Sequence, residues 1–334
     1  MLLALLACDS TPADAPPWGP VPMPAGPAVD PVVADLGRLL FYDPVLSSDG
    51  ETACATCHSE IWGMSDGLPV SIGVGGGRLT GPGRKGDNVT TRNAPTLWNV
   101  AFREGLFWDG RESSLEHQVS APLDSPIELD RPIDGVLAEL RSIPEYVTRF
   151  EAAFPGAPES LSEANLRASL AALQRTLIAS RSLYDAFVEG DPAALDARMR
   201  RGMQRFADLG CPACHVPPYF ESEGYFDRGL AGADRGRALV TGRPEDERAF
   251  RVPTLRNAQL TEPYFHDGSA PTLEVAIAHE IGASTGLAAD PADVEALAAF
   301  IGRALVDRSR EPDRPEVVPS GLPVPEDGFR ILRP

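Results

Sequence analysis

Residues 53–58 read Ala-Cys-Ala-Thr-Cys-His, and the pattern Cys-x-x-Cys-His returns at residues 211–215 as Cys-Pro-Ala-Cys-His. The two copies supply the same three side chains, which are Cys54, Cys57 and His58 in the first and Cys211, Cys214 and His215 in the second. This spacing is typical of c-type haem attachment. Both thiols then form thioethers with the two vinyl groups of one rigid macrocycle, and the adjacent histidine reaches the iron.

Two other uses of the four cysteines compete with haem. A four-thiolate zinc site usually takes two Cys-x-x-Cys pairs that lie roughly 15–20 residues apart, whereas Cys54 and Cys211 are 157 positions apart (211 − 54). Redox disulfides leave the histidine of each copy unexplained, and the thioredoxin-like βαβ pattern is absent. We therefore expect two covalently bound c-type haems, with His58 and His215 as the proximal ligands of the iron.

The composition indicates a soluble chain with room for two domains. Its 334 residues are enough for two ordinary hydrophobic cores, and 43% of them are hydrophobic. The formal net charge of −18 argues against nucleic acid and against an anionic membrane surface as partners. This charge suits a basic partner protein, although a solvated acidic surface explains it equally well.

The start of the chain carries an export signal. Leu5-Leu6-Ala7-Cys8 resembles the lipobox of bacterial lipoproteins, in which the cysteine is lipidated after cleavage, but no basic residue precedes it. We expect a periplasmic protein, because covalent haem attachment also takes place outside the cytoplasm. For Cys8 a lipid anchor and an ordinary, partly apolar tail are the two alternatives. Elsewhere the chain lacks the roughly 20 apolar residues of a membrane span, so we expect no transmembrane segment.

Helical periodicity dominates between two Pro-rich ends. We expect a mainly α protein with helices at residues 32–42, from Ser113 onward, and at 162–180, 192–209, 272–281 and 291–306. A boundary near Gly190 gives each unit one haem motif. The expected division is a signal remnant and Pro-rich tether (1–31), an N-terminal haem domain (32–190), a C-terminal haem domain (191–310) and a Pro-rich tail (311–334).

Four ordered strings extend the pattern beyond the haem motifs. They are LGRLLFYDPVLS (36–47), RNAPTLWN (92–99), FWDGR (107–111) and VPTLRNAQLTEPYFHDGSAPTLE (252–274). With them the chain resembles the bacterial di-haem cytochrome c peroxidase family, which includes the MauG-type enzymes. The resemblance implies two cytochrome-c-like domains, a peroxidatic first haem and an electron-transferring second haem. It also implies hydrogen peroxide as substrate, cytochrome c or a cupredoxin as electron donor, and a homodimer.

The resemblance assigns roles to individual residues. Trp108 matches the tryptophan that relays electrons between the haems, and Gln118 and Glu128 match the distal pair that handles the peroxide proton. A calcium site between the domains is implied as well, with ligands from Asn93, Thr261 and Pro263. From the residues alone, Trp108 is equally a packed aromatic, Glu128 a surface charge and Asn93 a turn residue.

Two positions depart from the family pattern. Val74 stands where the peroxidases carry a distal histidine, so the first haem is expected to be open without prior reduction, as in the MauG type. The sixth ligand of the second haem is Met or Tyr in the family, and here that slot holds Glu280, with His279 beside it. We expect His279 to bind the iron because imidazole is the stronger ligand. A second haem bound by Glu280, or without a sixth ligand, is the alternative.

Two histidines and three functions complete the sequence-based predictions. His266 is expected to form hydrogen bonds near the second haem, and His117 to lie on the surface. The leading function is peroxide reduction with electrons from a small redox protein. The alternatives are a MauG-type enzyme that oxidises residues of a partner protein and a non-catalytic di-haem electron carrier. The carrier requires strong ligands on both distal sides, and the sequence offers few of them near the first haem.

Overall fold

The computed structural model describes residues 15–328, so Cys8 and its predicted lipid anchor lie outside the described residues. The fold is mainly helical, as predicted, and the strands are only two residues long. The helices of the first half are α1 (Pro31–Tyr42), α2 (Cys54–Cys57), α3 (Leu115–Gln118), α4 (Ser120–Asp124), α5 (Ile133–Ser142), α6 (Pro144–Ala153) and α7 (Glu163–Thr176). Those of the second half are α8 (Leu183–Val188), α9 (Ala197–Asp208), α10 (Ala238–Thr241), α11 (Leu273–Thr285) and α12 (Pro291–Ala299), which continues as a π-helical turn over Phe300–Ala304.

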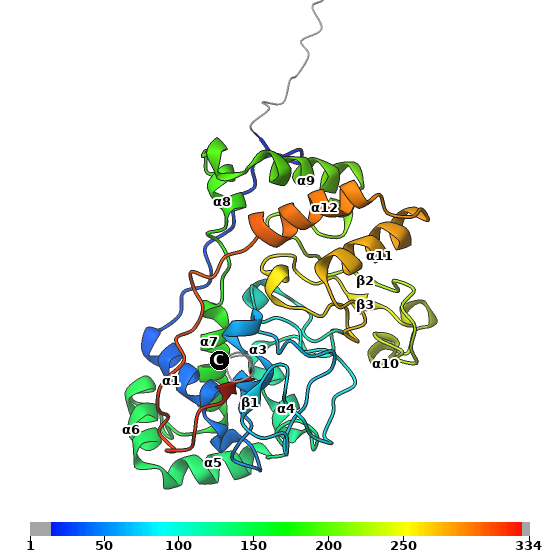
Figure 1. Ribbon diagram of the computed structural model, residues 1–334. Helices are drawn as coiled ribbons and strands as arrows, with labels where there is room; N and C mark the ends of the chain where they lie inside the picture. Colours follow the sequence, from blue (N-terminus) through cyan, green and yellow to red (C-terminus); the bar gives the residue numbers. More distant parts are fainter. Residues whose placement is uncertain (1–14, 329–334) are drawn as a thin grey trace, which may run out of the picture.

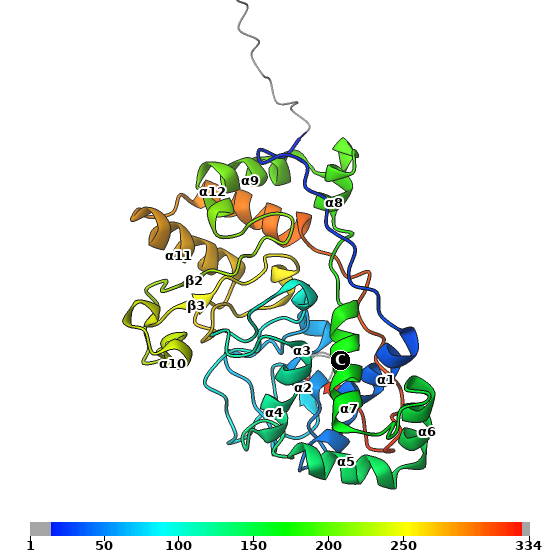
Figure 2. The same ribbon diagram turned by 180° about the vertical axis from the view of Figure 1, so that it is seen from behind.

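The helices form two lobes, with α1–α7 in one and α8–α12 in the other (Figure 1). The view from behind shows the same division (Figure 2). In the first lobe α1 packs on α7 at close range, because a Cβ at Gly37 would lie 1.9 Å from the carbonyl oxygen of Ser169. Each lobe has its own hydrophobic core, one built from residues between Leu36 and Ala179 together with Val318, and the other from residues between Tyr184 and Leu305.

The change of core lies earlier in the chain than predicted. Tyr184 and Phe187 of α8 are buried in the second core, whereas Ala179 still belongs to the first. The two cores therefore meet at residues 180–183 and not near Gly190. Helix α8 has only six residues, and its apolar side chains give little sequence signal about which core receives them.

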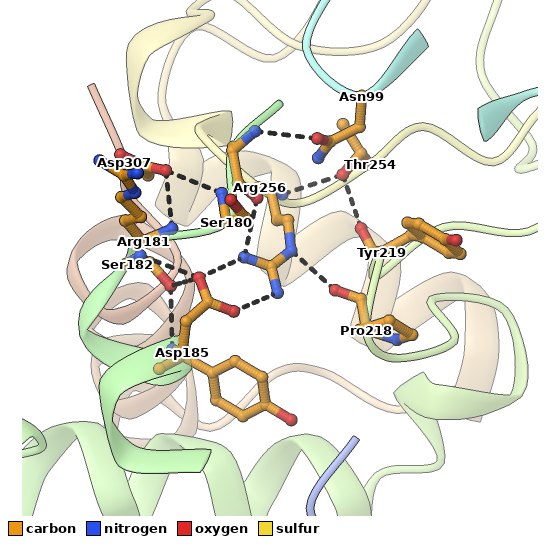
Figure 3. A network of polar contacts seen from close by, with 12 residues as sticks. Asn99, Ser180, Arg181, Ser182, Asp185, Pro218, Tyr219, Thr254, Arg256 and Asp307 are labelled. Atoms are coloured by element: carbon orange, nitrogen blue, oxygen red, sulfur yellow. Dashed lines mark hydrogen bonds and ion pairs between the residues drawn. The ribbon is translucent and has the colours of Figure 1, made fainter. Parts of the chain in front are cut away.

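A buried polar network fixes this connection (Figure 3). The guanidinium of Arg256 is completely buried and donates to both carboxylate oxygens of Asp185, at 2.8 and 2.7 Å. Its remaining donors reach the backbone carbonyls of Pro218 and Ala179. The carboxylate of Asp307 accepts from the backbone N–H groups of residues 180 and 181. Since a buried charge is tolerated only when it is paired, this network holds the two lobes in one arrangement.

The two lobes repeat one local scaffold. Asn99 and Asn257 both have a left-handed backbone, with φ of 59° and 60°, and each opens a 3₁₀ turn, Val100–Phe102 and Ala258–Leu260. Thr96 and Thr254 each donate to a backbone carbonyl at 2.7 Å. In each pair the second residue lies 158 positions after the first (257 − 99 and 254 − 96).

The same offset of 158 continues into the distal region. Phe107 and Phe265 both have positive φ, 63° and 70°. Trp108 then corresponds to His266 (266 − 108), and helix α3 corresponds to the start of α11. The chain therefore contains an internal repeat that extends well beyond the Cys-x-x-Cys-His motifs.

Both terminal segments cross from one lobe to the other. The segment before α1, expected to be a tether, starts beside α9 and runs down to α1 (Figures 1 and 2). Its Trp18 packs among aromatic rings of the second core and donates from Nε1 to the hydroxyl of Tyr184 at 2.8 Å. At the other end, Val318 is buried in the first core, and β4 (Glu326–Asp327) pairs in parallel with β1 (Leu79–Thr80).

Several predicted helix limits shift by a few residues. The short helix α3 is capped by Ser114 and not by Ser113. The helix predicted over residues 192–209 is interrupted, because Pro192–Ala194 is a separate 3₁₀ turn and α9 begins at Ala197. It ends before Gly210, whose φ of 75° is the predicted left-handed stop. None of the helices within residues 15–328 is long and apolar enough to cross a membrane.

Candidate haem cavities

Each Cys-x-x-Cys-His motif lines a cavity of its own. The first cavity, defined by Cys54, Cys57 and His58, is walled by α3, α4 and the loop around Glu128. The second cavity, defined by Cys211, Cys214 and His215, is walled by one face of α11 and by residues 226–234 and 248–255. The two cysteine pairs therefore do not form one four-thiolate zinc site. All four thiols are free, so the disulfide interpretation is not supported either.

The two histidines have the same tautomer. His58 Nδ1 lies 3.0 Å from the carbonyl oxygen of Met64, and His215 Nδ1 lies 3.1 Å from that of Phe220. A carbonyl only accepts, so Nδ1 carries the proton and Nε2 keeps its lone pair. Burial lowers the pKa of both rings, which keeps them neutral. This is the state in which imidazole binds a metal, with the second nitrogen anchored to the backbone.

The thiols fit a covalent attachment to haem. Burial raises the pKa of Cys54 to about 12 and that of Cys211 to about 11, so neither thiol is an exposed, ionised nucleophile in this fold. Both lie next to the imidazole of their own motif, and apolar side chains supply most of each cavity wall. This donor set of paired thiols, a neutral imidazole and an apolar cavity matches haem c.

Trp108 lies between the two cavities. It lines both of them, together with Asn93, Ala94 and Pro95. Its indole nitrogen donates to the carbonyl oxygen of Asn93 at 2.8 Å, and its own carbonyl accepts from the backbone of Arg251 at 2.9 Å. The side chain is 8% exposed. An aromatic ring is therefore fixed on the wall that the two cavities share.

Gln118 and Glu128 both line the first cavity, from α3 and from the loop after α4. Burial raises the pKa of the Glu128 carboxyl, and the guanidinium of Arg111 opposes that shift. A carboxyl in this environment exchanges protons more readily near neutral pH than a solvated glutamate does. Gln118 adds an amide on the same side of the cavity.

The loop that carries Val74 is held in place by a buried arginine. Arg84 is 4% exposed, and its guanidinium donates to the backbone carbonyls of residues 72, 73, 77 and 79 and to the hydroxyl of Thr52. Asn88 donates to the carbonyl of Val74 at 2.9 Å, and Asp49 accepts from the N–H of residue 75. The sequence reasoning missed Arg84, because a single arginine after a Gly-rich stretch reads as surface.

Gly73 connects this loop to Glu128. A Cβ at Gly73 would lie 2.0 Å from the carbonyl oxygen of Ile127 and 2.6 Å from the Cα of Glu128. Only glycine allows this close approach. The N–H of Val74 then donates to the Glu128 carbonyl at 2.9 Å. The loop therefore sets the backbone position of Glu128.

Helix α11 presents Glu280, and not His279, to the second cavity. Its cavity-lining residues follow helical spacing and are Leu273, Ala276, Ile277, Glu280, Ile281, Ser284 and Thr285. His279 is not among the residues that line the cavity, and its Nε2 lies 2.8 Å from the carbonyl oxygen of Arg228. The geometry therefore favours the alternative in which Glu280, and not His279, faces the second haem, because adjacent helical residues point about 100° apart.

A second arginine accompanies Glu280. Arg228 also lines the second cavity, and its guanidinium contacts the Glu280 carboxylate at 2.7 Å and the Ser284 hydroxyl at 2.7 Å. Burial lowers the pKa of His215, and the Glu280 carboxylate opposes this effect, so the carboxylate lies within electrostatic range of that ring. Sequence reasoning did not find Arg228, which lies in a long loop far from α11.

The remaining predicted residues lie near the junction of the cavities. His266 lines the second cavity and stacks on the ring of Phe250, with centroids 3.5 Å apart. Asn93, Thr261 and Pro263 line the same cavity, and Asn93 also lines the first. Among residues 15–328 no group of three or more His, Cys, Asp or Glu side chains forms a metal site, so a cation here depends on amide and carbonyl oxygens. His117 is exposed.

Comparison with known proteins agrees with this geometry. The family model for the di-haem cytochrome c peroxidases matches residues 31–193. Cytochrome c551 peroxidase of Pseudomonas aeruginosa is 37% identical over 276 residues, which are 80% of this chain and 77% of that protein. The chain belongs to the di-haem cytochrome c peroxidase family. It is therefore an oxidoreductase of a family named for two haem groups and for peroxidase activity.

Two further relatives lie on the MauG side of this family. Methylamine utilization protein MauG of Methylorubrum extorquens is 36% identical over 265 residues, which are 78% of this chain and 72% of that protein. A crystal structure of a MauG-like protein associated with microbial copper homeostasis superposes with a TM-score of 0.75 at 28% identity. That match covers 87% of this chain and 94% of the other. The fold of this peroxidase is thus shared with both branches.

Proposed function

We propose that this peroxidase reduces hydrogen peroxide in its first cavity, with electrons that enter through the second. The observation that carries the proposal is the pair of separate cavities, each with a Cys-x-x-Cys-His motif, that share Trp108 on one wall. When bound, the first haem supplies the iron at which the O–O bond is reduced. Both haems are held covalently, through Cys54 and Cys57 and through Cys211 and Cys214, with His58 and His215 as ligands.

Glu128 is the proton-transfer residue of the first cavity. Its carboxylate accepts a proton from the bound peroxide and returns it to the leaving oxygen, which then departs as water. The raised pKa of this carboxyl favours both halves of the transfer. Gln118 orients the peroxide by hydrogen bonding. The apolar walls, including Val119 and Leu123, exclude bulk water from the reacting oxygen atoms.

Trp108 relays electrons, and its neighbours hold it in place. The hydrogen bond from its indole to Asn93 and the packing on both cavities fix the ring in one orientation. His266 occupies the equivalent position of the repeat. A Ca²⁺ ion bound by the amide oxygen of Asn93 and the backbone carbonyls of Thr261 and Pro263 would stiffen this junction.

The surroundings of the enzyme follow from the same chemistry. Covalent attachment of haem takes place outside the cytoplasm, which supports a periplasmic location, with a lipid anchor at Cys8 if the lipobox is processed. The electron donor is a small redox protein, cytochrome c or a cupredoxin. The net charge of −18 favours a donor with a basic docking face. A homodimer is the proposed assembly.

A second function has its own support. Val74, which is only 6% exposed, replaces the distal histidine, and Arg84 fixes the loop that carries it. This arrangement leaves the first cavity open without rearrangement. It supports a MauG-type activity, in which oxidising equivalents pass to residues of a partner protein. The non-catalytic carrier receives no support, because Glu128 and Gln118 line the distal side of the first cavity, and among residues 15–328 no strong iron ligand lines that side.

The test uses the purified di-haem protein with hydrogen peroxide and a reduced small cytochrome c. Oxidation of the donor is followed optically without pre-reduction of the enzyme. Rapid turnover of the donor is the expected result. A long-lived oxidised spectrum with little donor turnover would instead assign the MauG-type activity. An unchanged spectrum after peroxide would reject both functions.

A further inference from the structure

The face of α11 that lines the second cavity carries no strong iron ligand among the described residues, and the other imidazole on the cavity wall, that of His266, stacks on the ring of Phe250. This helix face offers aliphatic side chains, the carboxylate of Glu280 and the hydroxyls of Ser284 and Thr285. The phenol hydroxyl of Tyr264, which also lines the cavity, donates to the carbonyl oxygen of Ala258 at 3.0 Å. His279 is turned to the carbonyl of Arg228. Carboxylate is the strongest donor that remains on this face.

The internal repeat identifies Glu280 as a residue of the distal face. With the offset of 158, Pro122 corresponds to Glu280 (280 − 122), and Gln118 corresponds to Ala276 (276 − 118). All four line their respective cavities. The position equivalent to His279 is Ala121 (279 − 158), which does not line the first cavity. The helices α3 and α4 in the first half and α11 in the second therefore turn equivalent positions toward their cavities.

Arg228 weakens the carboxylate as a ligand of iron. Its guanidinium contacts Oε2 of Glu280 at 2.7 and 3.0 Å and is itself anchored to the Ser284 hydroxyl. The Glu280 side chain is 36% exposed and that of Arg228 is 27% exposed, so the pair stays accessible from solvent. A carboxylate already neutralised by arginine donates less charge to a metal. The same pair presents a hydrogen-bond acceptor and a cationic donor side by side.

We propose that the second cavity is itself a binding site for a small weak-acid ligand, of the class of hydrogen cyanide and hydrogen peroxide, between Arg228 and Glu280. Glu280 accepts the hydrogen bond or proton of the entering molecule, and Arg228 stabilises the resulting anion on the open side of the haem. This inference rests on the proposed function in one respect, namely that a haem is attached at Cys211 and Cys214.

Cyanide is the probe, because it reports occupancy and not turnover. The ferric di-haem protein, checked for two haems per chain, is titrated while the haem absorption and its spin state are followed. We expect two cyanides per chain. Glu280→Met places a thioether at this position, so it should reduce the number to one and give a low-spin second haem at rest. Arg228→Gln should lower the affinity of the second cavity for cyanide by about 10-fold or more, as expected for the loss of a charged hydrogen bond.

His279→Ala is the matched control, since it changes the neighbouring residue on the other face of α11. The proposal expects two cyanides and an unchanged resting spectrum in this variant. One cyanide in the unaltered protein, rising to two in His279→Ala, would overturn the proposal and make His279 the ligand. One cyanide together with normal peroxide turnover would reject this inference alone. Two cyanides without turnover would reject the proposed function alone.

Discussion

The two halves of this peroxidase share one proximal scaffold and differ on the distal side. In both, the histidine of the Cys-x-x-Cys-His motif donates from Nδ1 to a backbone carbonyl, and a left-handed asparagine opens the next turn. Opposite the histidine, the first cavity offers Glu128 beside a loop that Arg84 holds in place, whereas the second offers the pair Arg228 and Glu280. The repeat shows that both halves use the same backbone scaffold around the motif histidine. A few side chains on the distal side then distinguish the two cavities.

A second contrast concerns the side chain that each half buries at one equivalent position of the repeat. Trp98 and Arg256 are equivalent in the repeat (256 − 98 = 158), and both are completely buried. The first half fills this position with an apolar ring, and the second fills it with a charge that requires Asp185. Since Asp185 follows the linker at residues 180–183, the charged version ties the second half to the connection between the lobes.

The largest difference between the two halves is expected when the cysteine pair of one motif is removed. Serine at both Cys54 and Cys57 should reduce covalent haem from two per chain to one and abolish peroxide turnover, since serine forms no thioether. Serine at both Cys211 and Cys214 should also leave one haem, but in the first cavity. Mass spectrometry of the denatured protein counts the attached haem. Two haems remaining in either double variant would contradict the assignment of the motifs.

Glu128→Gln tests the distal side of the first cavity. Loss of a positioned proton-transfer group should lower turnover by about 10²- to 10⁴-fold, with haem content unchanged. The rate of donor oxidation at saturating donor measures this effect. Asp124→Asn, at an exposed position on α4, is the matched control and should retain normal turnover. Equal rates for both variants would remove Glu128 from the mechanism.

Arg256→Gln tests the buried ion pair between Arg256 and Asp185 in the second half. Breaking a buried ion pair should lower the apparent free energy of unfolding by about 3–5 kcal/mol, because Asp185 is left buried and unpaired. Urea unfolding followed by tryptophan fluorescence measures this change. The control is Arg303→Gln, which removes an exposed ion pair with Asp196 and should leave the free energy of unfolding nearly unchanged, because water and salt screen such pairs. Similar losses in the two variants would contradict the role of the network.

Arg84→Gln tests the clamp on the loop of the first cavity. It leaves several backbone carbonyls of residues 72–79 without their donor, and each buried orphan costs about 1–3 kcal/mol. We expect faster proteolysis within residues 71–86 and lower turnover, while the second haem keeps its spectrum. A change confined to the second haem would show that the clamp acts elsewhere.

The smallest expected effect is the fall of peroxide turnover at low pH, which should depend on Glu128 of the first half and on no residue of the second. Burial raises the pKa of Glu128, and a proton acceptor works only when it is ionised. Turnover should therefore be complete above this raised pKa and fall as the pH drops through it, with a midpoint above the roughly 4.3 of a free glutamate. This fall should be absent in Glu128→Gln. A midpoint unchanged by that substitution would assign the fall to another group.

The local sequence was sufficient to predict the family and the features of the fold that depend on fixed spacing. The haem motifs, the helical class and the family strings each involve residues a few positions apart, and the structure brings Gln118, Glu128 and Trp108 to the first cavity as the resemblance implied. The repeat at an offset of 158 was also present in the sequence, in Pro-Thr-Leu-x-Asn (95–99 and 253–257) and in the aligned phenylalanines, but only the matching backbone angles made it visible.

Tertiary structure alone decided which distant side chains meet. Arg228 lies 52 positions before Glu280, and Arg256 lies 71 positions after Asp185, so neither pair leaves a local pattern. The choice between His279 and Glu280 depended on the rotation of α11 about its axis. That rotation is set by how Leu273, Ile277 and Ile281 pack in the second core. Spacing along the chain determines the Cys-x-x-Cys-His motifs and the helices, whereas tertiary packing determines which face of a helix lines a cavity.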